Sequence, residues 1–295
     1  MRTIHHVGIS RHCSSMADEI RQLNLELTNY LSDSTTGPWY FEIAEDDTRW
    51  TYIQPLLSQS AREQMWSRES YMFSLEELNH ASALSIVDCW TNGYPEPSDA
   101  KAVPGKNYLS YFPSVYDLAE YCSKCLTGAQ QKAPFRIKKD PPWGRRSFMQ
   151  LNWILDELFV TPAIFHSVFE PFGISCRPVL LEKSSRVSDS ICQLEISSVC
   201  NVEVENVPFT VCDHCRRRKY NVGYRGLFPV PSCHGPAICK SDQFFGGVQS
   251  AFKTILINDS LYRRTVADQL RGISFQPCVV RRPPVMPHEE SRRDC

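Results

Sequence analysis

The chain has 295 residues, of which 42% are hydrophobic and 22% are charged, and its formal net charge is -1. These values are typical of a globular protein with one large or two ordinary domains, and they exclude a strong general attraction to nucleic acid or anionic lipid. No apolar stretch approaches the roughly 20 residues of a membrane span, and residues 1–10 lack the apolar core of a signal peptide. We therefore expect a cytoplasmic protein whose 13 cysteines are reduced, either in the core or bound to metal.

Residues 1–115 are expected to form a mostly helical N-terminal region. Apolar residues recur at helical spacing over 14–31 and again, less regularly, over 54–66. A capping-box pattern begins a third helix over 74–89. Between the first two helices, apolar residues alternate over 39–43 as they do in a strand.

Residues 116–280 contain two similar segments, 155–180 and 253–280. Each has an apolar strand, a capped helix, a glycine and a second strand that begins after Gly-Ile-Ser. The expected N-caps and terminating glycines are Thr161 and Gly173 in the first segment, and Ser260 and Gly272 in the second. Residues 281–295 are rich in Pro, Arg and Glu, so we expect a disordered tail.

Two Cys-x-x-Cys pairs, Cys122–Cys125 and Cys212–Cys215, carry the strongest chemical signal. Two thiolates at this spacing can be presented to one metal ion by a tight turn. A closed structural zinc site needs four ligands, so the simplest interpretation is one Zn²⁺ shared by both pairs. The predicted fold is therefore α+β, with a helical N-terminal part and a duplicated strand–helix–strand region that the zinc site joins.

Other interpretations of the cysteines remain open. Either pair could be a redox pair or two free cysteines in a turn, although neither pair opens a long helix after a buried strand, as redox pairs usually do. Downstream, Cys233, His234 and Cys239 could form a second metal site with His214 or replace a ligand. Their pattern also fits an ordinary surface loop.

Two further patterns suggest different functions. The basic run over residues 216–219 directly follows the second pair, so a zinc-dependent nucleic-acid-binding module is one alternative. The strand-like residues 1–10 resemble the opening of glyoxalase-like metalloenzymes, and His5, His6 and His12 could hold a metal, so a metalloenzyme with an N-terminal site is another. The chain has no nucleophile elbow, phosphate loop or dinucleotide fingerprint, and we expect no catalytic activity.

The order of motifs over residues 115–280 resembles the double-CxxCG proteins, a paralogous family first noticed in myxobacteria. It runs from the first pair through Trp-Gly at 143–144 and the capped helix to the second pair and a closing Gly-Ile-Ser-Phe-Gln-Pro at 272–277. The closing segment is also similar to immunity proteins of bacterial polymorphic-toxin systems. The chain departs from the family at Leu126 and Arg216, where the family has glycine. The resemblance implies a cytoplasmic, non-catalytic protein that binds and neutralises a cognate toxin.

Overall fold

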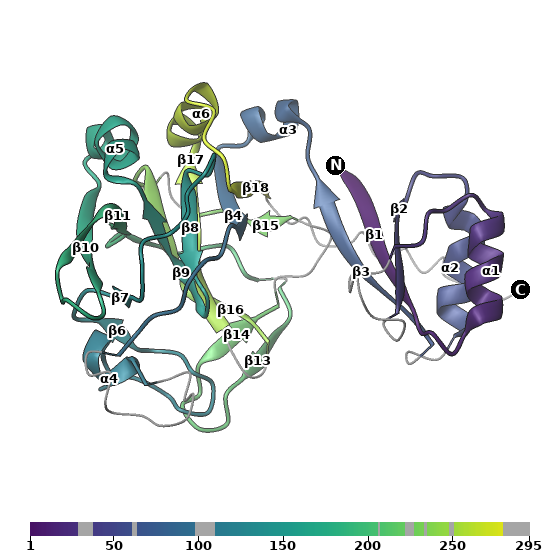
Figure 1. Ribbon diagram of the computed structural model, residues 1–295, viewed down its shortest axis with the longest axis horizontal. Helices are drawn as coiled ribbons and strands as arrows, with labels where there is room; N and C mark the ends of the chain where they lie inside the picture. The colour runs from purple at the N-terminus through teal and green to yellow at the C-terminus, as the bar shows by residue number, and fades with distance from the viewer. Residues whose placement is uncertain are drawn as a thin grey trace, which may run out of the picture. The chain divides into compact units, whose positions relative to one another are not determined.

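The computed structural model divides the chain into two compact units, Met1–Glu77 (unit 1) and Leu78–Cys295 (unit 2). Strands hold 42% and helices 20% of the residues that the structure describes (Figure 1). The prediction of a helical N-terminal part is therefore wrong, because unit 1 is built on a sheet. The expected tail over 281–295 lies outside the described residues, which are 1–28, 38–60, 64–97, 110–205, 207–221, 227–232, 235–247 and 251–279.

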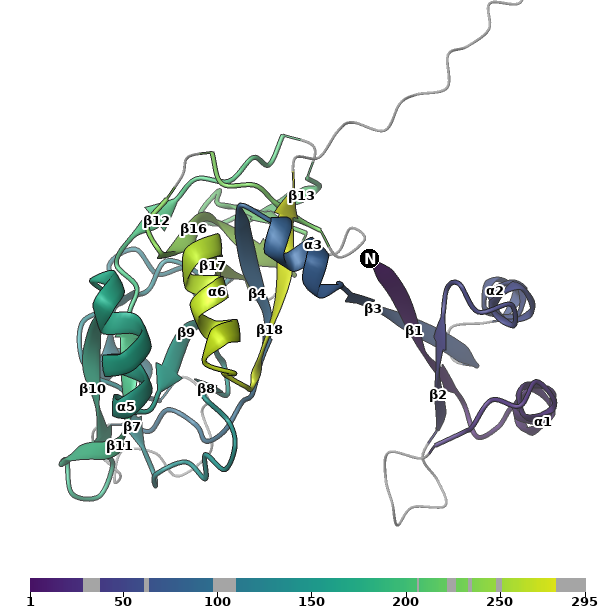
Figure 2. The same ribbon diagram turned by 90° about the horizontal axis from the view of Figure 1, so that it is seen from above.

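Unit 1 is a three-stranded antiparallel sheet with two helices on one face (Figure 2). The strand order is β2-β1-β3, and the central strand pairs with both neighbours. The elements are β1 (Arg2–Ile9), α1 (Ser14–Gln22), β2 (Trp39–Ala44), α2 (Trp50–Gln59) and β3 (Met65–Met72). Alternate strand residues pack against the inner sides of the helices, and this core includes Val7, Ile9, Ile20, Phe41, Ile43, Ile53 and Met65.

The helix expected over 74–89 forms only in its first half, and the second half is a strand. The capping box does form, since Ser74 and Glu77 exchange backbone and side-chain hydrogen bonds. The helix it starts, α3 (Leu75–His80), nevertheless has only six residues. Strand β4 (Ala83–Cys89) follows and pairs antiparallel on both sides. Burial between two neighbouring strands therefore overrides the local helical pattern.

Unit 2 contains two sheets in which five strands have the same arrangement. One sheet has the order β7-β10-β11-β9-β8, and the other contains β15-β18-β4-β17-β16. In both, the first two strands are parallel and every later pair is antiparallel. The first sheet has β7 (Arg136–Ile137), β8 (Phe148–Leu151), β9 (Ile154–Val160), β10 (Ser175–Leu181) and β11 (Val187–Glu195). The second has β4, β15 (Phe228–Pro229), β16 (Ile238–Gly246), β17 (Ala251–Asn258) and β18 (Ile273–Val279).

The middle strand of each five-strand arrangement comes from the other half of the chain. We call residues 83–181 the first repeat and residues 187–279 the second repeat. Strand β11, which opens the second repeat, lies between β9 and β10 of the first repeat. Strand β4, which opens the first repeat, lies between β17 and β18 of the second repeat. The repeats therefore exchange their first strands, and neither five-strand arrangement is complete without the other repeat.

The chain returns to its own repeat in the same way after each exchanged strand. Thr91, shortly after β4, forms a parallel bridge with Gln150 in β8. Strand β12 (Val199–Cys200), shortly after β11, pairs in parallel with β16. Because β8 and β16 hold the same place in the two sheets, this correspondence extends the duplication beyond the segments found in the sequence.

Both predicted strand–helix–strand segments occur, as β9 to β10 and as β17 to β18. Their helical parts are α5 (Pro162–Ile164), η1 (Phe165–Phe169) and η2 (Glu170–Phe172) in the first segment, and α6 (Asp259–Ala267) in the second. Thr161 caps the first as predicted, and Gly173 ends it with a φ of 72°. In the second, Asn258 accepts the capping bond from the N–H of Leu261, so the cap lies two residues before the predicted Ser260.

A buried ion pair joins the two repeats. Lys240 in β16 contacts Glu157 in β9, and both side chains are largely buried. Gln193 in β11 donates to the second oxygen of Glu157 at 3.0 Å. Burial raises the pKa of Glu157, whereas for Lys240 the charge of Glu157 offsets burial and raises the pKa. Removing one partner would leave a buried charge unpaired, so this contact favours one alignment of the two sheets.

No helix among the described residues is long and apolar enough to cross a membrane.

The largest apolar cluster lies inside unit 2 and contains residues from strands of both repeats. Its members include Leu84, Phe148, Leu158, Val160, Leu194, Ile255, Ile257 and Leu261.

A chain cut between the repeats should stay assembled. We predict that a protease site inserted into the loop over residues 182–186 can be cleaved without separating the fragments, because each fragment carries the middle strand of the other's sheet. Native size-exclusion chromatography should show one peak before and after cleavage, and two fragments only in denaturant. Separate elution without denaturant would contradict the exchanged-strand topology.

Candidate metal centre

Each Cys-x-x-Cys pair lies in the loop of a short antiparallel hairpin. The first pair lies between β5 (Tyr116–Asp117) and β6 (Gln130–Gln131), which pair with each other. The second lies between β13 (Phe209–Val211) and β14 (Arg218–Tyr220), which also pair. Within the chain, one hairpin precedes β7 and the other precedes β15, so both pairs occupy the same place in their repeats.

The two turns share the same backbone hydrogen bonds. In the first knuckle, residues 122–127, the N–H of Leu126 donates to the carbonyl of Cys122 at 2.7 Å, and the N–H of Cys122 donates to the carbonyl of Thr127 at 2.9 Å. The second knuckle, residues 212–217, has Arg216 N–H to Cys212 O at 2.9 Å and Cys212 N–H to Arg217 O at 3.0 Å. The duplication therefore extends to the turns that present the thiols.

Each knuckle has a residue other than glycine at the position where its turn needs a left-handed backbone. Leu126 has a φ of 57° and Arg216 a φ of 62°. A residue with a Cβ adopts this conformation at a cost of about 1 kcal/mol relative to glycine. The turn therefore forms without glycine, and each knuckle carries some backbone strain.

The four thiols of Cys122, Cys125, Cys212 and Cys215 converge into one cluster. All four sulfur atoms lie within 4.8 Å of one another. The Sγ atoms of Cys122 and Cys212 are 3.9 Å apart, and those of Cys125 and Cys215 are 3.5 Å apart. A tetrahedron with metal–sulfur bonds of about 2.3 Å has edges of about 3.8 Å. The structure thus brings all four predicted site residues together in a geometry that can hold a metal ion.

Backbone N–H groups favour the thiolate form of the first cysteine in each knuckle. The N–H groups of Cys215 and His214 lower the pKa of the Cys212 thiol to about 6. At Cys122, burial raises the pKa, but N–H groups of its own turn outweigh burial and the net shift is downward. Burial raises the pKa of Cys215 to about 11. A bound cation would overcome this last effect, since metals deprotonate the thiols that bind them.

Polar contacts connect the two knuckles around the sulfur atoms. The guanidinium of Arg217 donates to the carbonyl of Thr127 at 3.2 Å and to the carboxylate of Glu120 at 3.3 Å. Lys124 pairs with Asp213 at 3.3 Å, although both side chains are exposed and such pairs contribute little. The knuckles are thus held together by protein contacts as well as by any shared metal.

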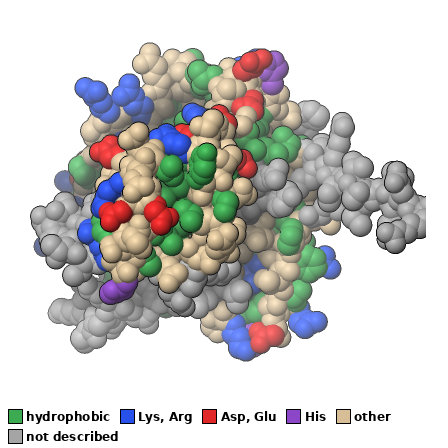
Figure 3. Space-filling view, turned by 90° about the vertical axis from the view of Figure 1, so that its right-hand side faces the viewer, with side chains coloured by type: hydrophobic (Ala, Val, Ile, Leu, Met, Phe, Trp, Pro, Cys, Tyr) green, Lys and Arg blue, Asp and Glu red, His purple; other side chains and the backbone are tan. Residues whose placement is uncertain are grey.

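Most residues of the basic run after the second pair contact neighbouring parts of the protein or are buried. Arg217 contacts the first knuckle, Arg218 lies 4.8 Å from the ring centre of Phe209, and Lys219 is buried. Arg216 is exposed at the turn. Elsewhere, Figure 3 shows acidic and basic side chains intermingled on the face it presents. This arrangement differs from the continuous basic surface that nucleic-acid binding favours.

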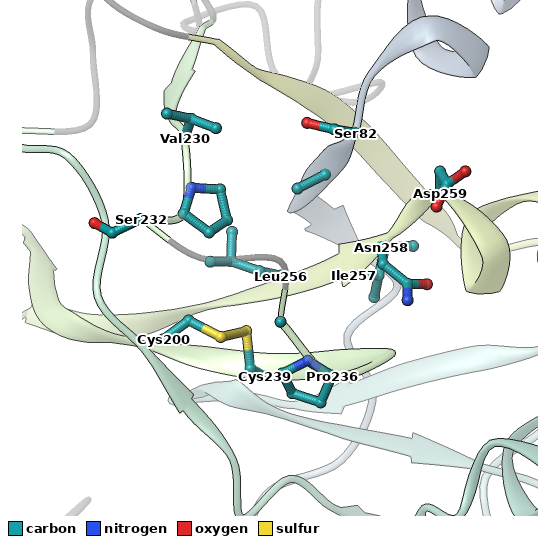
Figure 4. A pocket seen from close by; sticks show the side chains of 13 residues that line it. Ser82, Cys200, Val230, Ser232, Pro236, Cys239, Leu256, Ile257, Asn258 and Asp259 are labelled. Carbon is teal, nitrogen blue, oxygen red and sulfur yellow. A yellow bond between two sulfur atoms is a disulfide. The ribbon is translucent and has the colours of Figure 1, made fainter.

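The expectation that the cysteines are reduced is wrong for one pair. Cys200 in β12 and Cys239 in β16 form a disulfide, with Cα atoms 6.1 Å apart. The disulfide lies in the wall of a pocket of about 220 Å³ (Figure 4). Cys239 is therefore unavailable as a metal ligand, and Cys233 and His234 lie outside the described residues. The parallel pairing of β12 with β16 brings these cysteines together, which their separation of 39 residues does not predict.

The N-terminal histidines do not converge. His5 and His6 are adjacent in β1, so they point to opposite faces of the sheet. His5 is buried and stacks on Trp50 with ring centres 3.7 Å apart. His12 is exposed after the strand. Among the described residues, the four-cysteine cluster is the only group of three or more metal-ligating side chains, so these histidines form no such group.

The comparisons with known proteins leave the site to be interpreted from its own geometry. No protein-family model, no curated protein and no solved structure matches this chain.

Glycine should relieve the strain in each knuckle. We predict that Leu126→Gly or Arg216→Gly stabilises the metal-loaded protein by about 1 kcal/mol, because only these knuckle residues have a left-handed φ. Ser123→Gly is the matched control and should destabilise, since it only adds freedom to the unfolded chain. Denaturant unfolding measures all three. Destabilisation by the first two substitutions would show that the turn geometry is wrong.

Proposed function

We propose that the four-cysteine cluster binds one structural Zn²⁺. The observation that carries the proposal is the set of four sulfur atoms within 4.8 Å of one another. Tetrahedral thiolate sites suit zinc or iron, and a four-thiolate zinc site has no open position for water or substrate. The metal would supply charge neutralisation and a rigid link, while the knuckle N–H groups stabilise the thiolates.

The proposed zinc links the two repeats. Each repeat contributes one knuckle, and the same repeats already exchange strands β4 and β11. A structural zinc contributes on the order of 10 kcal/mol in small zinc peptides. Here the apolar core of unit 2 also stabilises the fold. Metal removal should therefore loosen the two hairpins before it unfolds the sheets.

We propose that this rigid unit acts as a non-catalytic binding protein that neutralises a cognate protein toxin. Support comes from the resemblance to double-CxxCG and immunity proteins and from the closed four-thiolate geometry. In the closing motif, Gly272 accepts a hydrogen bond from the N–H of Trp90, and Phe275 packs edge-on against Tyr262. The motif therefore completes the second sheet. A preformed surface would lower the ordering cost of binding a partner.

The zinc proposal predicts one metal per chain. Elemental analysis of purified protein should give about one zinc, and Cys122→Ser or Cys212→Ser should each abolish it because each removes one of four shared ligands. Cys176→Ser, at an exposed free cysteine, is the control and should retain the metal. Two zinc ions per chain, another metal in their place, or retention after either knuckle substitution would overturn the proposal.

The binding proposal predicts protection against a toxin encoded by a neighbouring gene. Co-expression of this protein should restore growth, and the two purified proteins should form a 1:1 complex. Cys212→Ser should lose protection together with its metal and the order of the two hairpins, which limited proteolysis detects, whereas Cys176→Ser should protect fully. A folded, zinc-loaded protein that neither binds the toxin nor restores growth would refute the binding role and leave the zinc assignment intact.

A further inference from the structure

Among the described residues of unit 1, no helix covers one face of the sheet, and this face carries a hollow. Both α1 and α2 lie on the opposite face (Figure 2). The hollow has a volume of about 770 Å³. It is lined by side chains from all three strands and by Glu26 and Thr28. Its lining residues all belong to unit 1, whereas the four cysteines belong to unit 2.

Three side chains in this hollow lie in a row, joined by one hydrogen bond and one ion-pair contact. Nε2 of His6 lies 2.7 Å from the hydroxyl oxygen of Ser70, and Nδ1 of His6 lies 3.0 Å from a carboxylate oxygen of Glu42. His6 is in β1, Ser70 is in β3 and Glu42 is in β2. In this row Ser70 has the place of a nucleophile, His6 that of a base, and Glu42 that of a carboxylate that orients the base. Such a triad is recognised by its geometry and occurs on unrelated folds.

The strand register explains why these residues meet. His6 pairs directly with Glu42 on one side and with Arg68 on the other. Ser70 lies two residues beyond Arg68, so both point to the same face of β3. Arg68 lines the hollow, and no ion pair joins it to a described residue. A guanidinium that lines the same hollow as Ser70 can stabilise negative charge that develops there.

Aromatic side chains form an apolar wall beside this polar row. Trp66 and Tyr40 line the hollow and meet edge to face with ring centres 6.2 Å apart. Gly8 lies between them in the sheet, paired with both residues. A Cβ at Gly8 would overlap the indole of Trp66, so glycine is what lets this ring lie across the sheet. The wall can bind a flat or apolar group next to Ser70.

We propose that Ser70, His6 and Glu42 form a nucleophilic site that hydrolyses carboxylic esters whose aryl or alkyl group lies against Trp66 and Tyr40. The hydroxyl oxygen of Ser70 bonds to the ester carbonyl carbon while its proton passes to Nε2 of His6. The carbonyl electron pair moves to the oxygen beside Arg68. When the intermediate collapses, the bond to the leaving alcohol breaks and that alcohol takes the proton from His6. Water then cleaves the acyl-Ser70 ester by the same proton transfers.

This site differs from the metalloenzyme considered from the sequence. Its base is His6 alone among the N-terminal histidines, and its partners Glu42 and Ser70 carry no sequence motif. The proposal goes beyond the binding role of unit 2 and does not depend on it. Glu42 is a positioning residue, because it contacts His6 and not the ester.

The test uses the full-length protein with a fluorophosphonate probe and 4-nitrophenyl acetate. The probe should phosphonylate Ser70 with loss of fluoride, as peptide mass spectrometry would show, and the ester should be turned over. Ser70→Ala should abolish both, and His6→Gln should slow them at least about 100-fold. Ser67→Ala is the matched control, since this serine is on the same strand but points to the other face, and it should retain both activities.

The Glu42→Gln variant distinguishes a role of Glu42 in orienting His6 from a role in stabilising the fold. It keeps a polar group beside Nδ1 but removes the carboxylate charge that orients the ring, so it should lower kcat for 4-nitrophenyl acetate while leaving KM unchanged. Zinc content and far-ultraviolet circular dichroism should stay unchanged in all variants. Absence of label at Ser70 in the folded wild-type protein, or ester turnover that Ser70→Ala leaves unchanged, would overturn the proposal.

Discussion

The reciprocal placement of β4 and β11 is the constraint on which the rest of unit 2 depends. Each strand hydrogen-bonds on both sides to strands of the other repeat. Its backbone N–H and C=O groups would be left unpaired in an apolar core if the repeats separated, and such groups are costly to bury. The apolar cluster and the Glu157–Lys240 pair depend on this exchange of strands, because both require the two sheets to stay in one alignment.

The four-cysteine cluster follows from the same duplication. A repeat that carries one knuckle supplies two thiols, which is half of a closed site. When two such repeats interlock, their knuckles meet, and the turns match in their hydrogen bonds and in the sign of φ at Leu126 and Arg216. A single metal can then neutralise the thiolates of both repeats. This explains how ligands about 90 residues apart in the chain form one site without a compact zinc motif.

Local sequence signals predicted the cysteine turns and helix ends better than they predicted the architecture. The four cysteines, the Thr161 cap and the Gly173 terminus depend on nearby residues, and the structure places them as expected. The strand β4 was missed because its partners β17 and β18 lie more than 160 residues away in sequence, and the capping box before it favours a helix. The Cys200–Cys239 disulfide and the Glu42–His6–Ser70 contacts were missed for a similar reason, because strand register, not spacing along the chain, brings them together.

The coordination of the bound metal tests the shared site most directly. Extended X-ray absorption fine structure of the purified, metal-loaded protein should show one zinc environment with four sulfur neighbours at about 2.3 Å and no nitrogen or oxygen neighbour. This result would require both Cys-x-x-Cys pairs to bind the same ion. A zinc with two sulfur neighbours and two lighter ligands would mean that each pair acts alone, and it would contradict a metal link between the interlocked repeats.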